Sequence, residues 1–300
     1  MLKRGFSQRG FFMKLISFLR RHPEVPCLLL AAAIFCFWQN NTLCVTRLSF
    51  ESGRLPAAFD GTVIVHLSDL HSKSFGKNQD RLVRGVRELC PDYIVFTGDA
   101  VDSRRFDIEP VTSLVSQLCG IAPTFFVTGN HELRSGRSGE VCRAVQQAGA
   151  VLLDNAGLFV ERGGERIFLC GLADQGSLQE PDAQAALLQT LDGLSQQSEG
   201  AFSLLLSHRP ELFSLYAQAC MDLSFCGHAH GGQWRLPLVG GLYAPGQGLF
   251  PQYTAGLYLE GEQAMVVSRG LGNSLFPLRL FNRPEVIALT LHTPSQEEPG

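Results

Sequence analysis

The sequence lacks the paired cysteine spacing that marks a disulfide framework or a zinc finger. It contains nine cysteines, an odd number, and most of them lie in or beside apolar stretches. We therefore expect small, buried, unpaired thiols. Free buried thiols are commoner in proteins of reducing compartments, but a cell surface with few disulfides and a cytoplasmic face would each accommodate them.

The chain also lacks internal repeats and a strong net charge. Its formal net charge is −3 over 300 residues, so a surface for nucleic acid is not expected. A chain of this length can form one large α/β domain with additional elements. Residues 293–300 are polar and contain proline, and we expect a disordered tail there.

The first 45 residues differ from the rest, because no acidic residue precedes Glu24. Residues 25–38 form an apolar stretch that is short for a membrane span, but extension to Val45 gives about 20 residues, enough to cross a bilayer. No small-x-small cleavage site follows the apolar core, so we expect an uncleaved signal anchor with a transmembrane helix. Upstream basic residues predict a cytoplasmic N-terminus and a following domain outside the cytoplasm: Lys3, Arg4, Arg9, Lys14, Arg20 and Arg21.

From residue 46 to residue 292, β-rich runs alternate with helical ones. Helices are expected over residues 78–90 and 138–148, where apolar side chains recur on one face. This alternation predicts an α/β fold, and the strand-rich last third suggests a second sheet packed on the first. Strands are expected at residues 62–67, 93–97, 124–128, 167–170, 202–206, 223–226, 265–267 and 286–289.

Five short polar clusters stand at the ends of apolar runs, and they contain five of the eight histidines. The first three clusters place a carboxylate, a carboxylate and an amide just past three strand ends. In open α/β sheets, ligand sites lie outside the carboxyl ends of the strands. The clusters read Ser68-Asp69-Leu70-His71, Gly98-Asp99-Ala100-Val101-Asp102, Gly129-Asn130-His131-Glu132, Ser207-His208 and Gly227-His228-Ala229-His230.

The donor atoms in these clusters predict metal binding. Hard oxygen donors combined with imidazoles suit divalent Zn, Mn or Fe better than a calcium cage. Asp69 and His71 are two residues apart, as are His228 and His230, and in extended backbone this spacing directs both side chains toward one ion. We therefore expect two divalent metal ions as cofactors.

The ordered set DxH, GDxxD, GNHE, H and GHxH resembles the calcineurin-like metallophosphoesterase superfamily. All five motifs are in register between Asp69 and His230, and the likeness covers roughly residues 60–290. The GHAHGGQ segment and residues 268–272 resemble a branch of membrane-associated bacterial phosphoesterases, which includes lipid-sugar nucleotide pyrophosphatases. The resemblance implies a four-layer αββα sandwich and a dinuclear metal-dependent phosphoesterase.

The resemblance also implies a role for each motif residue. Asp99 would bridge the two ions, and a hydroxide between them would be the nucleophile. His131 would neutralise charge or protonate the leaving oxygen, Asp102 would accept a hydrogen bond from His131 and fix its tautomer, and Glu132 would orient the loop. The first ion would be held by Asp69, His71, Asp99 and His230, and the second by Asp99, Asn130, His208 and His228.

Substrate contacts are less clearly marked. Trp234 and Arg235 follow the last motif and are candidates for an apolar or ring group and for phosphate, respectively, although a plain surface loop is an equal alternative. Residues 240–250, rich in glycine and proline, predict either a lid or a hairpin connection. Further basic candidates are Arg269, Arg279 and Arg283.

The class of substrate stays open. A lipid carrying a phosphodiester or pyrophosphate, a soluble nucleotide or diester, and a phosphoprotein all fit the motifs, and the predicted anchor favours the first. An inactive scaffold is the other reading. It would be expected to have lost a bridging carboxylate, the asparagine or the catalytic histidine, but Asp99, Asn130 and His131 are all present.

Overall fold

The computed structural model describes residues 13, 17–176, 181–274 and 276–294. Four of the six basic residues that predict a cytoplasmic N-terminus lie outside this range: Lys3, Arg4, Arg9 and Lys14. Residues 295–300 of the predicted disordered tail also lie outside it. All nine cysteines are inside it and none is in a disulfide. Cys170 and Cys226 are buried as expected, whereas Cys27, Cys90 and Cys220 are exposed, so the expectation of buried thiols is wrong for those three.

The first six-stranded sheet carries the N-terminal half of the domain. Three consecutive pairings are parallel, between β2 and β3, β3 and β4, and β4 and β5, and β1 and β16 also pair in parallel. The last strand, β16, runs antiparallel to β2 and separates it from β1. In sheet order the strands are β1 (Cys44–Glu51), β16 (Glu285–His292), β2 (Val63–Leu67), β3 (Tyr93–Thr97), β4 (Thr124–Val127) and β5 (Val151–Leu152).

The second six-stranded sheet carries the C-terminal half. Its centre is parallel, from β15 through β9 and β8 to β7, and each edge strand is antiparallel to its neighbour. Strands β8 and β9 are buried along their whole length, as expected for strands covered on both faces. In sheet order the strands are β14 (Gly256–Glu260), β15 (Gln263–Val267), β9 (Leu223–Cys226), β8 (Ser203–Leu206), β7 (Glu165–Gly171) and β6 (Ala156–Arg162).

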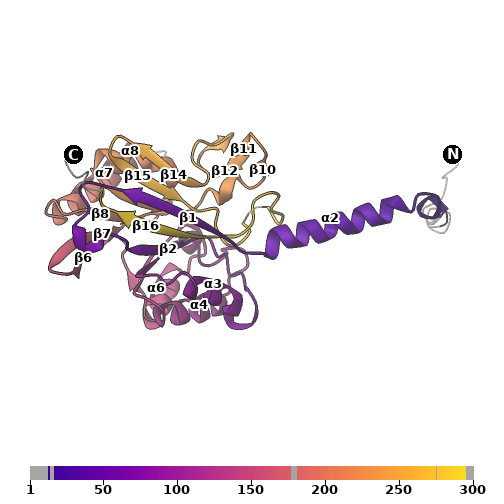
Figure 1. Cartoon of the computed structure of the whole chain (residues 1–300), viewed down its shortest axis with the longest axis horizontal. Coiled ribbons are helices and arrows are strands. Elements are labelled where there is room, and N and C mark those ends of the chain that lie inside the picture. The colour runs from indigo at the N-terminus through magenta and orange to yellow at the C-terminus, as the bar shows by residue number, and fades with distance from the viewer. Residues whose placement is uncertain (1–12, 14–16, 177–180, 275, 295–300) are drawn as a thin grey trace, which may run out of the picture.

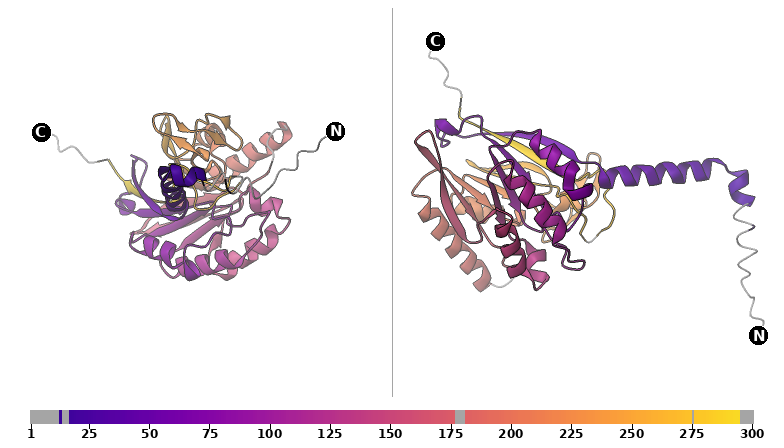
Figure 2. Two further views of the ribbon diagram at one scale, coloured as in Figure 1. Left: turned by 90° about the vertical axis from the view of Figure 1, so that its right-hand side faces the viewer. Right: turned by 90° about the horizontal axis from the view of Figure 1, so that it is seen from below.

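The two sheets face each other and helices cover their outer faces (Figures 1 and 2). Ile64 and Val95 of the first sheet pack with Leu204 and Phe225 of the second in one apolar cluster. The four-layer αββα architecture is therefore confirmed. Helices α3 (Asp80–Arg87), α4 (Glu109–Cys119) and α6 (Ser138–Gln147) cover the first sheet, and α7 (Pro181–Gln197) and α8 (Phe213–Gln218) cover the second.

Short elements fill the connections between these layers. The glycine-rich segment predicted as a lid or hairpin forms two small antiparallel hairpins, one of which includes Arg235. The hairpins are β10 (Arg235–Leu236) with β11 (Gly240–Gly241), and β12 (Tyr243–Ala244) with β13 (Gly248–Leu249). The remaining elements are α5 (Asn130–Arg134), η1 (Ala57–Phe59), η2 (Lys77–Gln79), η3 (Pro210–Leu212) and η4 (His230–Gly232).

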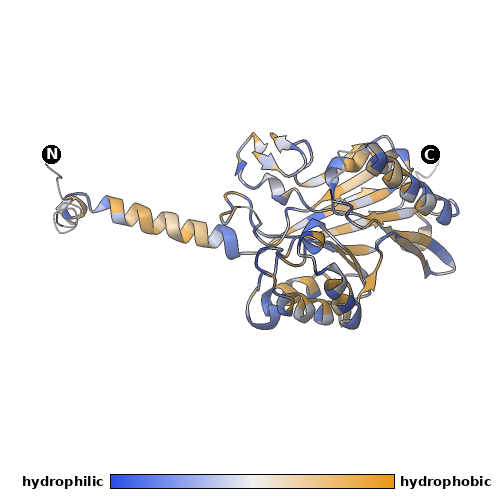
Figure 3. Cartoon of the chain, turned by 180° about the vertical axis from the view of Figure 1, so that it is seen from behind, coloured by the Kyte–Doolittle hydropathy of each residue, from blue (hydrophilic) through white to orange (hydrophobic). Residues whose placement is uncertain are grey.

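The N-terminal apolar segment is helix α2 (Glu24–Asn41), which projects from the domain and is apolar over most of its length (Figures 1 and 3). The predicted transmembrane helix over residues 25–45 is corrected here, because α2 ends at Asn41 and Val45 already pairs with Val286 in the first sheet. No helix within the described ranges has both the length and the apolar character needed to cross a membrane. The predicted placement outside the cytoplasm depended on that span and stays a prediction.

The last turn of α2 is part of the folded domain. Gln39 is only 4% exposed, and Asn40 Oδ1 accepts hydrogen bonds from the backbone of Arg279 at 2.9 Å and from Asn273 Nδ2 at 3.0 Å. Lys73 Nζ donates to the Asn40 carbonyl at 2.5 Å. These contacts favour a domain that starts near Gln39, whereas the sequence predicts a boundary at residue 46.

Asn40→Ala tests this assignment. The substitution leaves two donors of the domain without their acceptor, so we expect it to lower the free energy of unfolding by about 1–3 kcal/mol. Denaturant unfolding of the full chain measures the change. Asn41→Ala is the matched control, because the one acceptor of the Asn41 amide among the described residues is the Phe37 carbonyl of its own helix. It should change stability by less than about 0.5 kcal/mol, and equal effects of the two variants would contradict the assignment.

Candidate metal centre

The polar clusters all follow strand ends, and they come from both sheets. Asp69, Asp99 and Asn130 follow the neighbouring strands β2, β3 and β4, whereas His208 and His228 follow β8 and β9. Because the carboxyl ends of parallel strands meet at one edge, the packing of the sheets brings these side chains together.

The backbone at these strand ends is locally strained. Positive φ values between 48° and 64° occur at five predicted metal ligands, and this region is sparsely populated for residues other than glycine. Gly98 and Gly129 are needed there, since a Cβ on Gly98 would lie 2.4 Å from the Gly129 nitrogen, and one on Gly129 would lie 2.4 Å from Asp99 Oδ1. The five ligands with positive φ are Asp69, His71, Asp99, His228 and His230.

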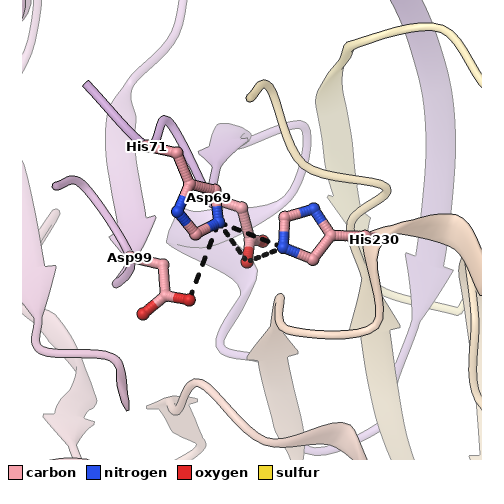
Figure 4. A group of neighbouring side chains, drawn as sticks. All are labelled: Asp69, His71, Asp99 and His230. Atoms are coloured by element: carbon pink, nitrogen blue, oxygen red, sulfur yellow. Dashed lines mark hydrogen bonds and ion pairs between the residues drawn. The ribbon is translucent and has the colours of Figure 1, made fainter. Parts of the chain in front are cut away.

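The first ligand group consists of Asp69, His71, Asp99 and His230, whose donor atoms all lie within 4.8 Å of one another (Figure 4). His71 Nε2 is 3.1 Å from His230 Nε2 and 3.8 Å from Asp99 Oδ2, and His230 Nε2 is 3.4 Å from Asp69 Oδ1. All four side chains are buried. Two ring nitrogens and two carboxylates that converge in this way form a donor set suited to a divalent cation.

The second group shares Asp99 with the first and adds His208 and His228. His208 Nε2 is 3.2 Å from Asp99 Oδ2 and 3.1 Å from His228 Nδ1. His208 Nδ1 donates to the Thr97 carbonyl at 2.7 Å, which leaves Nε2 free to bind a metal.

The side-chain amide of Asn130 provides a test of cation binding. One end of this amide lies 2.7 Å from His228 Nδ1 and 3.2 Å from His208 Nε2. When the oxygen occupies that end it faces only acceptor atoms, an arrangement that a cation satisfies, whereas the opposite orientation allows hydrogen bonds to both rings. With the Asn130 oxygen at that end, the oxygen and imidazole donors of both groups fit two divalent ions.

Electrostatics at the centre keep three imidazoles neutral. Burial lowers the pKa of His71 to about 3, and burial also holds the pKa values of His228 and His230 well below the ordinary value. Neutral rings are the form that ligates metals. Burial raises the pKa of Asp69 to about 6, an effect that the neighbouring charge of His208 opposes.

His208 and Asp99 behave as an ion pair. Burial alone would lower the pKa of His208, but the Asp99 carboxylate raises it to about 10. Burial alone would raise the pKa of Asp99, but His208 holds it well below its usual range. A cation that binds both groups would replace the proton of His208, so metal binding is coupled to proton release.

His131 lies at the edge of the centre, and its hydrogen bonds fix which nitrogen carries the proton. The backbone N–H of Ser103 donates to His131 Nδ1 at 3.1 Å, so in the neutral ring the proton is on Nε2, which faces Ser274 Oγ at 3.3 Å. The predicted hydrogen bond from His131 to Asp102 is corrected here, because Asp102 Oδ1 is 3.6 Å from Nδ1 and accepts instead from the backbone of Arg104 at 2.8 Å. Burial lowers the pKa of His131.

Glu132 connects two loops of the centre, in agreement with its expected orienting role. Its fully buried carboxylate accepts from the backbone N–H groups of Asp99 at 2.8 Å, Gly129 at 2.7 Å and Val101 at 3.1 Å. Burial raises its pKa to about 8. The loops after β3 and β4 are thereby held at a fixed separation.

A polar cluster behind His228 is absent from the sequence-based prediction. Arg209 forms a bidentate pair with Asp174 at 2.7 and 3.1 Å, and it also contacts Glu211 Oε1 at 3.3 Å. Glu211 Oε1 lies 3.9 Å from His228 Nε2, on the side of the ring away from the metal group. The position of Arg209 directly after His208 could have marked it as a residue near the metal centre. Its pairing with Asp174, 35 positions earlier, could not be predicted from the local sequence.

Trp234 and Arg235 contact the protein rather than the cavity at the centre. Trp234 Nε1 donates to the Leu278 carbonyl at 3.0 Å, and Arg235 Nη1 donates to the Gly231 carbonyl at 2.9 Å and to Thr254 Oγ1 at 3.1 Å. The structure therefore gives both side chains a packing role, and their assignment as substrate contacts stays a prediction.

The cavity over the centre has a volume of about 540 Å³. Metal-group residues form its floor, and the hairpin that contains β12 and β13 contributes part of its wall. Residues around it include Ser103, Arg104, His131, Arg134, Tyr243, Pro245, Gly246 and Ser274.

Comparison with known proteins gives a consistent family. Residues 62–232 match the model of the calcineurin-like phosphoesterase family. The chain is 31% identical over 253 residues to an uncharacterised metallophosphoesterase, YkuE, of Bacillus subtilis, which covers 82% of this chain and 84% of YkuE. It is 33% identical over 236 residues to the phosphodiesterase YaeI of Escherichia coli, with 76% and 81% covered.

One vertebrate relative is named as a transmembrane protein. The chain is 29% identical over 249 residues to the transmembrane protein with metallophosphoesterase domain of Danio rerio. The match covers 79% of this chain and 55% of that protein.

The shared position of Asp99 gives a direct test of the two ligand groups. Asp99→Ala removes a carboxylate from both groups at once, so we expect the purified protein to lose both bound ions, measured by elemental analysis after incubation with Mn²⁺. The Mn²⁺-induced rise in melting temperature, which reflects binding to the folded state, should disappear as well. Asp60→Ala, at an exposed carboxylate paired with His292, should keep both properties. Retention of one full equivalent of Mn²⁺ by Asp99→Ala would show that the groups do not share this ligand.

Proposed function

We propose a reaction for this chain from its membership of the calcineurin-like phosphoesterase family, which makes it a phosphoester hydrolase. The chain cleaves a phosphodiester, phosphomonoester or pyrophosphate bond at the centre described above. The observation that carries this proposal is the pair of buried Asp/His groups joined through Asp99 beneath an open cavity. A scaffold without activity would have no need of buried ligands, which are costly to maintain.

The proposal assigns every ligand predicted from the sequence. When bound, two divalent ions would lower the pKa of a water between them and neutralise charge on the phosphoryl oxygens. The mixed oxygen and nitrogen donors suit Mn, Fe or Zn. The first ion would be held by Asp69, His71, Asp99 and His230, and the second by Asp99, Asn130, His208 and His228.

His131 would act on the leaving group from the cavity wall. The Ser103 backbone N–H occupies Nδ1, so the ring proton is on Nε2, which faces Ser274 Oγ at 3.3 Å, and both of these side chains line the cavity. A proton at Nε2 can be shared with the leaving oxygen as the phosphorus–oxygen bond breaks. Asp102 would contribute by holding the loop and Arg104, with which it makes a hydrogen bond through the Arg104 backbone.

We also propose that the substrate is membrane-associated or lipid-linked. Helix α2 supports this, because it exposes apolar side chains around its whole circumference, including Leu28, Ile34 and Phe37, which are 67%, 61% and 70% exposed. Exposed apolar surface of this extent marks an interaction site. A lipid surface would cover it and would place the cavity near a lipid substrate.

The hydrolase proposal is tested with a substrate panel. The full chain, supplied with Mn²⁺, should hydrolyse at least one of bis(4-nitrophenyl) phosphate, 4-nitrophenyl phosphate and a nucleoside diphosphate ester, and a chelator should abolish the activity. The relative rates would separate diester, monoester and pyrophosphate preference. No turnover on the panel with Mn²⁺, Fe²⁺ or Zn²⁺ would refute the proposal.

His131→Ala separates proton transfer from metal binding. We expect the variant to retain both ions and to lose about 10²–10⁴-fold in kcat, the usual contribution of a positioned proton donor. Elemental analysis and steady-state kinetics measure the two effects. The loss should be smaller for substrates with a good leaving group such as 4-nitrophenolate, which needs little protonation. An empty metal site or an unchanged kcat would show that His131 has a different role.

Association with lipid is tested by vesicle flotation. The full chain should float with phosphatidylcholine vesicles in high salt, and replacement of both Ile34 and Phe37 by serine should reduce the floating fraction severalfold. Leu249→Ser is the control, since Leu249 is comparably exposed, at 73%, but lies on a hairpin of the domain. Equal flotation of the α2 variant and the wild type would remove the support that α2 gives to a lipid-linked substrate.

A further inference from the structure

The cavity over the metal groups contains two arginines that the ligand assignment leaves unused. Arg104 and Arg134 both line it, together with His131. The volume of about 540 Å³ exceeds what one phosphoryl group needs, so a bound substrate would extend beyond the metal ions toward these side chains.

Arg104 is oriented but retains donors for a ligand. Its Nε lies 3.4 Å from Asp102 Oδ1, and its Nη2 donates to the Ser274 carbonyl. Asp102 is a partial counter-charge, yet it contacts the guanidinium through Nε alone. The Nη1 group has no partner within the described residues, and the side chain is half exposed.

Arg134 is held at the cavity by the short helix α5. It follows Asn130 by four residues, so one helical turn returns its side chain to the same face as Asn130. Its Nη1 lies 3.2 Å from the Asn130 amide. No carboxylate oxygen of the described residues lies within 4.0 Å of the Arg134 guanidinium, so Arg134 forms no direct ion pair there.

The other arginines near the centre are committed to the fold. Arg269 pairs with Glu285, and Arg235 donates to Gly231 and Thr254. Arg279 is buried and donates to carbonyls of its own loop, including those of Arg269 and Asn282. The arginines that line the cavity are therefore Arg104 and Arg134. The sequence suggested other arginines as substrate contacts: Arg235, Arg269, Arg279 and Arg283.

We propose that Arg104 and Arg134 form an anion site beside the metal groups, which holds a second phosphate of the substrate. Guanidinium groups bind phosphate oxygens through paired, charge-assisted hydrogen bonds, which suits this position. The inference rests on the proposed function and narrows it: the substrate carries two phosphates, as in a pyrophosphate ester, with one at the metal groups and the other at the arginines.

The test compares two substrates on the full chain. Arg134→Gln and Arg104→Gln should each lower kcat/KM for a nucleoside diphosphate ester by about 10- to 100-fold, mainly through KM, because a charge-assisted hydrogen bond is lost. Hydrolysis of bis(4-nitrophenyl) phosphate, which has a single phosphate, should change less than about threefold. Arg134→Lys should recover part of the loss. Arg84→Gln, on the exposed face of α3 and paired with Asp80, should leave both substrates unaffected.

A binding measurement separates this inference from the hydrolase proposal. Calorimetric titration of the Mn²⁺-loaded chain should give tighter binding of inorganic pyrophosphate than of phosphate, and the two glutamine variants should remove most of that difference. If the wild type turns over no substrate but shows this arginine-dependent preference, the anion site stands and the hydrolase proposal fails. If the variants lose activity equally on both substrates, or bind pyrophosphate as the wild type does, the anion site is overturned.

Discussion

The carboxylate of Asp99 is the interaction on which the rest of the site depends. Its Oδ2 atom faces His208 at 3.2 Å and His71 at 3.8 Å, so one atom belongs to both ligand groups. Its Oδ1 atom accepts the backbone N–H of His131 at 2.7 Å, and its own backbone N–H donates to Glu132. Because side chain and main chain are both held, a shift of the loop after β3 would displace both groups and the cavity wall together.

The geometry around Asp99 is unfavourable for the free energy of folding, and the packing of the two sheets offsets this cost. Buried carboxylates and strained backbone are each unfavourable alone and persist only where the surroundings determine them. Here the ligands come from the ends of strands in both sheets, and the apolar cluster that includes Ile64, Val95, Leu204 and Phe225 sets the distance between those sheets. The core between the sheets thus fixes the spacing of the ligands, and the glycines at positions 98 and 129 allow the loops to approach closely.

The arginines around the centre fall into two groups, those that hydrogen-bond to the protein and those that line the cavity. Arg279, in the loop between β15 and β16, uses its guanidinium donors in hydrogen bonds to the backbone carbonyls of Arg269 and Gly272. The backbone N–H of Arg279 also donates to Asn40 Oδ1, so the end of the N-terminal helix reaches the loop whose Ser274 contacts His131. The cavity itself is left to Arg104 and Arg134, which follow the same strands as the ligands and are therefore positioned by the same core.

The sequence by itself determined the donor types, their order and their places after strand ends, because residue identity and hydrophobic pattern are local properties. The αββα layers followed from the family resemblance, and their packing in the structure agrees with it. The tertiary structure decided what depends on contacts between distant residues. The insertion of β16 between β1 and β2, and the end of α2 at Asn41, arise from pairing across more than two hundred residues. The proton position of His131 is set by the Ser103 amide rather than by Asp102, and this follows from the path of a loop 28 residues away in the chain. The sequence alone does not distinguish Arg235 from Arg104. The tertiary contacts show that Arg235 Nη1 donates to Gly231 and Thr254, whereas Arg104 lines the cavity and keeps Nη1 without a partner among the described residues.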